Sequence, residues 1–171
     1  AGNTKIALES ARRSIWLDDR CAECYAALGL VEIHTNDSTP SSIANTLSMV
    51  DELKQDRDDL LSIQNSLMKG IVYSQLNELQ EARSFFEKCV DYSKSFADAP
   101  AVNSPAFSNR VSGVTEAGLL FNSLCLNNLA VVKIYLPGAK IKETVEGAKE
   151  NFKMAYNLVA GKCNELGKEI K

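Results

Sequence analysis

The chain has 171 residues, of which 45% are hydrophobic and 24% are charged. This is enough apolar material for one folded domain, or for a compact piece of one, and it excludes a chain that is disordered throughout. The net charge is −3 and the basic residues form no stripe, so the electrostatic signature of a nucleic-acid-binding protein is missing.

Apolar side chains recur at helical spacing along most of the chain, so we expect an all-α fold of about seven helices. The expected ranges are 4–17, 22–34, 40–53, 58–76, 79–96, 115–135 and 140–158. Trp16, at the end of the first helix, is expected to fill a gap between helices. Pro40 suits the first turn of the third helix, where no backbone donor is needed. The run 51–59 carries charges of both signs and is interpreted as a solvated turn.

The segment 97–113 interrupts this periodicity. It contains Pro100 and Pro105, and it is long for a connection inside a compact domain. It therefore predicts an irregular loop that is either disordered or functional. The chain begins without methionine, on a helix that has no partner before it, so we expect residues 1–171 to form one domain taken from a longer protein.

One stretch predicts how two consecutive helices pack. Gly70, Ala82 and Cys89 are small and suit a close helix crossing, whereas Tyr73 and Phe86 are large enough to fill the space around it. A short polar break separates the two halves, so the segment predicts a helix, a tight turn and an antiparallel helix. One such hairpin cannot bury both of its apolar faces, and this favours a stack of similar hairpins.

These residues resemble the pattern of the tetratricopeptide repeat family, in which units recur about every 34 residues. Parts of the pattern recur elsewhere, although about six extra residues separate Ala130 from Ala148. The partial matches are Ala7, Ala11 and Ser14; Tyr25, Leu28 and Gly29; Leu126, Leu129 and Ala130; and Ala148, Phe152 and Ala155. The resemblance implies a right-handed α-solenoid of stacked antiparallel helix pairs, in which the first helix of each pair lines a groove.

The resemblance also implies which side chains line that groove. They are Glu23, Ala27, Leu30 and His34, then Gln64, Leu67, Met68, Ile71 and Gln75, and finally Leu124, Asn127, Asn128, Val131 and Tyr135. Members of the family use groove asparagines to bind the backbone of an extended peptide, which suggests this role for Asn127 and Asn128. The alternative is that these amides bond to a neighbouring helix or loop.

The cysteines and the single histidine give no chemical site. Five cysteines do not form a disulfide framework, and a reducing compartment, the cytoplasm or the nucleus, is expected. The spacing of Cys21 and Cys24 matches half of a metal site, but no second pair accompanies it, so these cysteines are interpreted as structural. His34 has no nucleophile in a recognisable arrangement around it. We therefore expect no catalytic residues, no metal and no cofactor.

The sequence favours a non-enzymatic scaffold that binds a peptide or an amphipathic helix of a protein partner within a larger complex. No membrane span is expected, because polar residues interrupt the apolar segment 119–136. An RNA-associated helical repeat is the alternative. It would depend on the lysines of the last two helices, which are Lys133, Lys140, Lys142, Lys149 and Lys153.

Overall fold

The computed structural model describes residues 2–35, 38–54, 60–98 and 108–136, and separate residues between 142 and 160. Six helices have defined bounds, and no strand occurs in the described part of the chain. They are α1 (Gly2–Leu17), α2 (Ala22–Thr35), α3 (Pro40–Leu53), α4 (Leu60–Gln75), α5 (Leu79–Asp98) and α6 (Ser108–Tyr135). Every described residue between 142 and 160 is helical, in agreement with the expected seventh helix.

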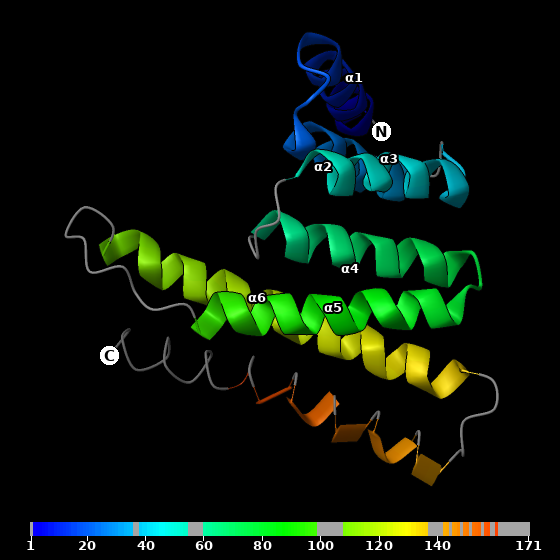
Figure 1. Ribbon diagram of the computed structural model, residues 1–171, viewed down its shortest axis with the longest axis vertical. Coiled ribbons are helices and arrows are strands. Elements are labelled where there is room, and N and C mark those ends of the chain that lie inside the picture. Colours follow the sequence, from blue (N-terminus) through cyan, green and yellow to red (C-terminus); the bar gives the residue numbers. More distant parts are fainter. Residues whose placement is uncertain are drawn as a thin grey trace.

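The helices form an α-solenoid of antiparallel pairs. Each helix packs against the next one in the chain, and α4 also packs against both α2 and α6. Figure 1 shows the stack running from α1 through α4 to α5, with α6 crossing behind α5. The even-numbered helices are therefore neighbours across successive pairs, as the predicted arrangement of first helices requires.

Two glycines allow the paired helices to cross closely. A Cβ atom added to Gly70 would lie 2.4 Å from Cε1 of Phe86, and one added to Gly29 would lie 2.5 Å from Cδ2 of Leu47. Phe86 is 1% exposed and Leu47 is fully buried, so each glycine makes room for a large core side chain of the following helix. The predicted contact between a small and a large residue is confirmed for α4 with α5, and it recurs for α2 with α3.

The turn between α4 and α5 follows from its sequence. Asn77 has a φ of 60°, a left-handed conformation that asparagine tolerates better than most residues. The N–H of Glu78 donates to the carbonyl of Tyr73 (2.9 Å), and that of Asn77 donates to the carbonyl of Ser74 (3.1 Å). These two bonds make a Schellman motif, which satisfies the last carbonyls of α4 and reverses the chain within three residues.

The helix α3 begins as its sequence predicts. Thr39 caps its N-terminus by accepting the N–H of Ser42 (3.2 Å), and Pro40 occupies the first turn.

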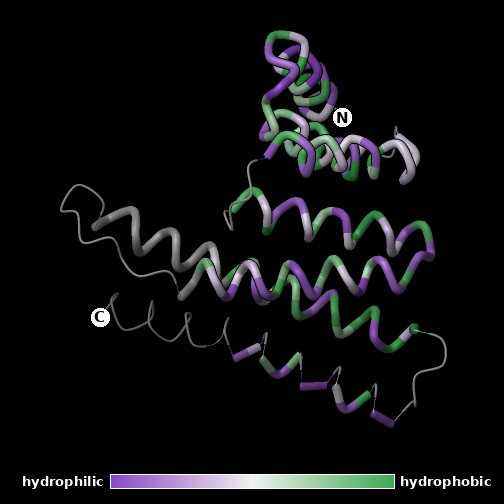
Figure 2. The backbone as a smooth tube through the Cα atoms, in the orientation of Figure 1, coloured by the Kyte–Doolittle hydropathy of each residue, from purple (hydrophilic) through white to green (hydrophobic). Residues whose placement is uncertain are grey.

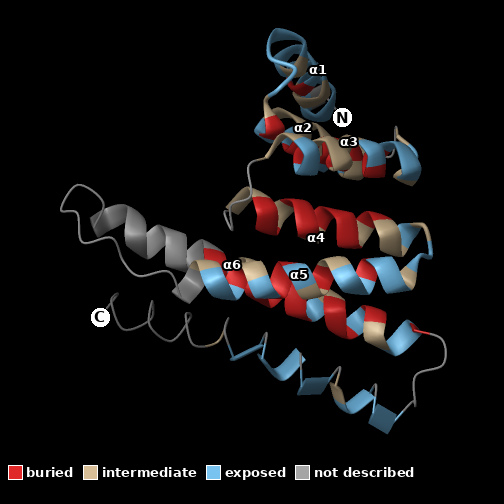
Figure 3. Ribbon diagram, in the orientation of Figure 1, coloured by how far each residue is buried: buried red, intermediate tan, exposed pale blue. Residues whose placement is uncertain are grey.

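The buried side chains form two apolar cores that meet at α4. Ile63 belongs to the core that α4 shares with α5 and α6. Met68 and Val72 belong to the core that α4 shares with α2 and α3. Figure 3 shows α4 as the most continuously buried helix, and Figure 2 shows hydrophobic and hydrophilic stretches alternating along the tube. The chain thus buries its apolar residues in two layers on either side of one helix.

Three expectations need correction. Trp16 is 82% exposed, because no helix of the described chain covers that side of α1. The predicted loop 97–113 is too long, since α5 extends to Asp98 and α6 already begins at Ser108; residues 99–107 lie outside the described part. Phe152 is 38% exposed, unlike Phe86, so it does not repeat the same packing role; Ala148 and Ala155 lie outside the described residues.

Candidate functional site: two pockets along the first helices

A pocket of about 590 Å³ lies between α2 and α4, with one side chain added from α6; we call it the α2–α4 pocket. Its lining is apolar except for Glu23 and Gln64. The complete lining is Glu23, Ala26, Ala27, Leu30, Leu60, Leu61, Gln64, Leu67, Met68 and Phe121. Six of these residues belong to the set predicted from the sequence, namely Glu23, Ala27, Leu30, Gln64, Leu67 and Met68.

A second pocket of about 430 Å³ lies between the C-terminal ends of α4 and α6, beside the turn into α5; we call it the α4–α6 pocket. It includes four more of the predicted residues, Ile71, Asn128, Val131 and Tyr135. Its other lining residues are Ser74, Asn77, Leu79, Phe86 and Val132. The predicted groove residues are therefore divided between two pockets that both border α4.

Four of the predicted groove residues line neither pocket. They are His34, Gln75, Leu124 and Asn127, and all four are exposed. The Nδ1 atom of His34 lies 2.8 Å from the carbonyl oxygen of Leu30, one turn earlier in the same helix. This contact holds the imidazole ring at the C-terminal end of α2.

Phe121 was not among the predicted groove residues, yet it is the only contribution of α6 to the α2–α4 pocket within the described part of the chain. Phe121 lies three positions before Leu124, on nearly the same face of a helix, so extending the predicted face of α6 by one turn would have included it.

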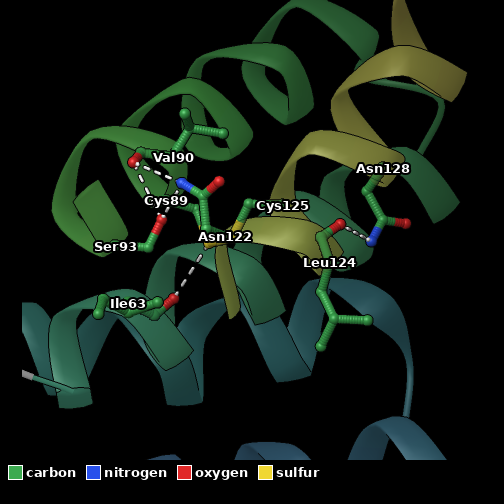
Figure 4. The surroundings of a disulfide bond; sticks show 8 residues. All are labelled: Ile63, Cys89, Val90, Ser93, Asn122, Leu124, Cys125 and Asn128. Carbon is green, nitrogen blue, oxygen red and sulfur yellow. Dashed lines mark hydrogen bonds between the residues drawn. A yellow bond between two sulfur atoms is a disulfide. The ribbon is translucent and has the colours of Figure 1, made fainter. Parts of the chain in front are cut away.

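The two candidate asparagines behave differently. The Nδ2 atom of Asn128 donates to the carbonyl oxygen of Leu124 (2.8 Å) in its own helix, rather than to a neighbouring helix or loop. Figure 4 shows the carbonyl oxygen of the Asn128 side chain pointing away from that bond. Asn127 is exposed. Asn128 lines the α4–α6 pocket, and its side-chain oxygen takes no part in the bond to Leu124.

Apolar side chains on the first helices are unusually exposed beside these pockets. Leu30 is 49% exposed, Val131 is 39% exposed and Tyr135 is 69% exposed. Each of them lines one of the two pockets. A grouping of exposed apolar residues around a pocket is characteristic of an interaction surface.

A polar network connects α3 to α4. Asp51 accepts from Lys69, from Nδ2 of Asn65 (2.8 Å) and from Nζ of Lys54 (3.2 Å). The Lys69 side chain is only 7% exposed, whereas that of Asp51 is 41% exposed. Partial burial of Asp51 works to raise its pKa, but the hydrogen bond and charge of Lys69, with those of Lys54, outweigh burial and hold the pKa of Asp51 below its ordinary value.

This network corrects the interpretation of the run 51–59 as a solvated turn, since Asp51 and Lys54 are part of α3 or its C-cap and bind α4. Residues 55–59 lie outside the described part of the chain.

A second buried carboxylate holds the N-terminal helices together. Glu32 of α2 is 5% exposed. Its Oε1 accepts from Oγ of Ser38 (3.1 Å), and its Oε2 accepts from Oγ1 of Thr46 in α3 (3.2 Å). The Nη2 atom of Arg12 in α1 lies 4.0 Å away. Glu32 therefore contacts α1, α3 and the connection between α2 and α3, which is a structural role.

The expectation that the five cysteines form no disulfide framework is wrong for four of them. Cys21 is paired with Cys24, and Cys89 of α5 is paired with Cys125 of α6, with Cα atoms 5.2 Å and 5.8 Å apart. Cys163 lies outside the described residues. The pairing of Cys89 with Cys125 could not be predicted from the sequence, because these residues are 36 positions apart and only the fold brings them together. The expectation of a reducing compartment stays a prediction.

Figure 4 shows that a buried amide accompanies the second pair. The Nδ2 atom of Asn122 in α6 donates to Oγ of Ser93 (2.8 Å) and to the carbonyl oxygen of Val90 (3.3 Å), both in α5. Ser93 also donates to Val90 (3.0 Å). The position of α6 against α5 is thus fixed by a covalent bond and by directional hydrogen bonds one turn away.

The lysines proposed for RNA binding do not form a uniformly positive surface in the described part of the chain. Lys142 and Lys153 are exposed, and the Nζ of Lys149 lies 4.0 Å from a carboxylate oxygen of Glu146. Lys133 is half-buried, and Lys140 lies outside the described residues. Glu143 and Glu150 stand among the same helical residues, so the local charge is mixed.

Within the described ranges, no group of three or more histidine, cysteine or acidic side chains could hold a metal ion. None of the described helices is both long enough and apolar enough to cross a membrane.

No protein-family model and no curated protein matches the chain. Among solved structures, one titled "Crystal structure of MamA" matches with a TM-score of 0.46 and 15% sequence identity, and the alignment covers 95% of this chain and 92% of that chain. A superposition with this TM-score assigns no function. The likeness to tetratricopeptide repeats is one of fold, and it rests on the helix packing described above.

Proposed function

We propose that the chain is a non-enzymatic protein-interaction scaffold whose first helices bind an amphipathic helix or a short apolar segment of a partner protein. The observation that carries this proposal is the apolar α2–α4 pocket, bordered by the exposed side chain of Leu30. Its volume of about 590 Å³ is in the range of pockets that receive ligand groups. An apolar helix face inserted between two helices is a common mode of peptide recognition.

The single carboxylate of the lining suggests the chemistry at one end of the bound segment. Glu23 lies in the first turn of α2 and is exposed, so it can pair with a lysine or arginine of the partner without being desolvated alone.

We propose that the Asn128 side-chain oxygen accepts a backbone N–H of an extended continuation of the partner in the α4–α6 pocket. We also propose that this binding takes place in a reducing compartment, the cytoplasm or the nucleus.

A matched pair of variants tests the pocket. Leu30→Glu places a charge in the α2–α4 pocket, and Leu30 is 49% exposed, so the folded state should tolerate the change. Ile134→Glu is the control, because Ile134 is 48% exposed on α6 but lines neither pocket. Helical peptides selected from a displayed library on the wild-type chain serve as probes, and fluorescence anisotropy measures their affinity.

We expect Leu30→Glu to weaken peptide binding by about tenfold or more, since an unpaired carboxylate in an apolar contact is costly, and Ile134→Glu to leave binding within about twofold of wild type. Circular dichroism should show the same helix content for all three proteins. If the library yields no binder, or if both variants bind equally well, the α2–α4 pocket is not the recognition surface.

A further inference from the structure

The cysteine pair at the start of α2 is placed differently from the pair between α5 and α6. Cys21 directly precedes α2, and its sulfur accepts the N–H of Cys24 (3.1 Å). Both Cys21 and Cys24 are partly exposed, whereas Cys89 and Cys125 are fully buried. The first pair is therefore open to small molecules, and the second is not.

The position of Cys21 also favours the reactive form of its sulfur. The N–H of Cys24 also donates to the carbonyl oxygen of Cys21 (3.0 Å). When the bond to Cys24 is reduced, this N–H can be shared with a Cys21 thiolate, and the positive end of the α2 dipole stabilises negative charge there. A thiolate, not a thiol, attacks a disulfide. Cys24 lies one helical turn away with its Cα 5.2 Å from that of Cys21, within the range needed to form the intramolecular bond.

A metal site would be the other use of this spacing. Structural zinc needs four ligands, and among the described residues no third histidine, cysteine or acidic side chain joins the pair. A pair of cysteines that bond to one another, are reachable from solvent and have no further ligand is suited to thiol–disulfide exchange.

We propose that Cys21 and Cys24 form a thiol–disulfide exchange site that reacts with low-molecular-weight disulfides of the glutathione class. The Cys21 thiolate attacks one sulfur of glutathione disulfide, a mixed disulfide forms, and one glutathione thiolate leaves. The Cys24 thiolate then attacks the Cys21 sulfur and releases the second glutathione thiolate. Two electrons pass from the protein dithiol to the glutathione disulfide, and the two thiol protons pass to the released glutathione. The reverse sequence, with two molecules of glutathione, restores the dithiol.

The site lies beside the surface proposed for binding, because Glu23 stands between the two cysteines and lines the α2–α4 pocket. The exchange chemistry does not depend on what that pocket binds.

The sequence makes the test direct, because trypsin separates the cysteines. Cleavage after Arg20 and Lys54 gives a peptide 21–54 that contains Cys21 and Cys24 alone, whereas Cys89 and Cys125 fall in peptides 89–94 and 111–133. The folded chain is reduced, freed of reductant and incubated in buffers of increasing glutathione disulfide content. Acid quenching, alkylation and mass spectrometry then report the state of each pair in the same sample.

We expect peptide 21–54 to pass from doubly alkylated to internally bonded as glutathione disulfide increases, and to return when glutathione is added. The buried pair should change at least about tenfold more slowly, since its sulfurs react only after local opening. No transition in peptide 21–54, or equal rates for the two pairs, would overturn the proposal.

Two single variants identify the attacking sulfur. Cys24→Ser should accumulate a glutathione adduct on Cys21, because the resolving thiol is gone. Cys21→Ser should form an adduct on Cys24 about tenfold more slowly, because the helix N-terminus favours thiolate formation at Cys21. Equal rates would contradict the role given to Cys21, and the absence of any adduct would contradict the site. Matching circular dichroism spectra show that both variants fold.

Discussion

The close crossing of α4 and α5 can be tested at Gly70. In Gly70→Ala the new Cβ would lie 2.4, 2.6 and 2.8 Å from three atoms of the Phe86 ring. Separations below 3.0 Å essentially never occur for real Cβ atoms. The ring is 1% exposed in a packed core, so it cannot move aside without disturbing its neighbours. Overpacking of this kind costs about 1–3 kcal/mol.

An opposing effect must be subtracted, since alanine favours a helix interior over glycine by about 1 kcal/mol. Gly147 supplies that correction, because it is helical and a Cβ there would meet nothing within 4 Å. We expect Gly147→Ala to be neutral or to stabilise the chain by up to about 1 kcal/mol. The change in the free energy of unfolding caused by Gly70→Ala should be about 1–3 kcal/mol less favourable than that caused by Gly147→Ala. Urea unfolding followed by circular dichroism measures both free energies.

The partner of Gly70 can be changed as well. Adding Phe86→Leu to Gly70→Ala should relieve part of the overpacking. The double variant should therefore be destabilised by about 1 kcal/mol less than the sum of the two single changes. Gly29→Ala should cost less than Gly70→Ala, because it meets the end of the Leu47 side chain rather than a ring. If Gly70→Ala stabilises the chain as much as Gly147→Ala, Phe86 does not pack over Gly70 and the pairing of α4 with α5 is wrong.

Three further predictions concern polar groups and are measured by the same unfolding experiment. Asp51→Asn should destabilise the chain by about 2–3 kcal/mol at neutral pH, because buried Lys69 is left without its charged partner. This is slightly below the cost of breaking a fully buried pair, because the Asp51 side chain is 41% exposed. Since the pKa of Asp51 is lowered in the folded state, its contribution to the free energy of unfolding is complete above the unfolded pKa of about 3.9 and is lost as the pH falls through the folded value. The free energies of unfolding of the wild type and of Asp51→Asn should therefore converge in acid, and a difference that stays constant with pH would contradict the ion pair. Asn122→Ala should cost about 1–3 kcal/mol, because the bonds from α6 to Ser93 and Val90 are lost, and an unchanged midpoint would contradict that contact. Thr39→Ala should cost about 1 kcal/mol through the lost cap of α3, and no loss would show that this cap contributes little.

The parts of the fold that were predictable depend on local spacing. The positions of Gly70 and Phe86 relative to the turn place one against the other in any antiparallel hairpin, so a single stretch of sequence was sufficient. The start of α3 at Pro40 was also predictable, because proline restricts the backbone within its own turn. The pocket residues of α2 and α4 followed from the resemblance to tetratricopeptide repeats, which implies that first helices line the groove, together with helical periodicity, which fixes the face that each side chain occupies.

The parts that were missed depend on contacts between distant segments or on absent neighbours. Lys69 lies within an apolar stretch, and nothing in that stretch shows that Asp51, 18 positions earlier, will neutralise it. The bond between Cys89 and Cys125 likewise needs the register of α5 against α6. Trp16 was expected to be buried because large aromatic residues usually are, but burial requires a second surface, and the described chain provides none there.

The position of α4 between two separate cores has a consequence for how the chain unfolds. The residues of α4 that face α5 and α6 share no core with those that face α2 and α3, so the two ends of the stack are coupled chiefly through this helix. In a linear array, cooperativity is carried by interfaces between neighbours. Weakening either face of α4 should therefore divide one melting transition into two, with the amides of α4 the last to exchange hydrogen in the intact chain.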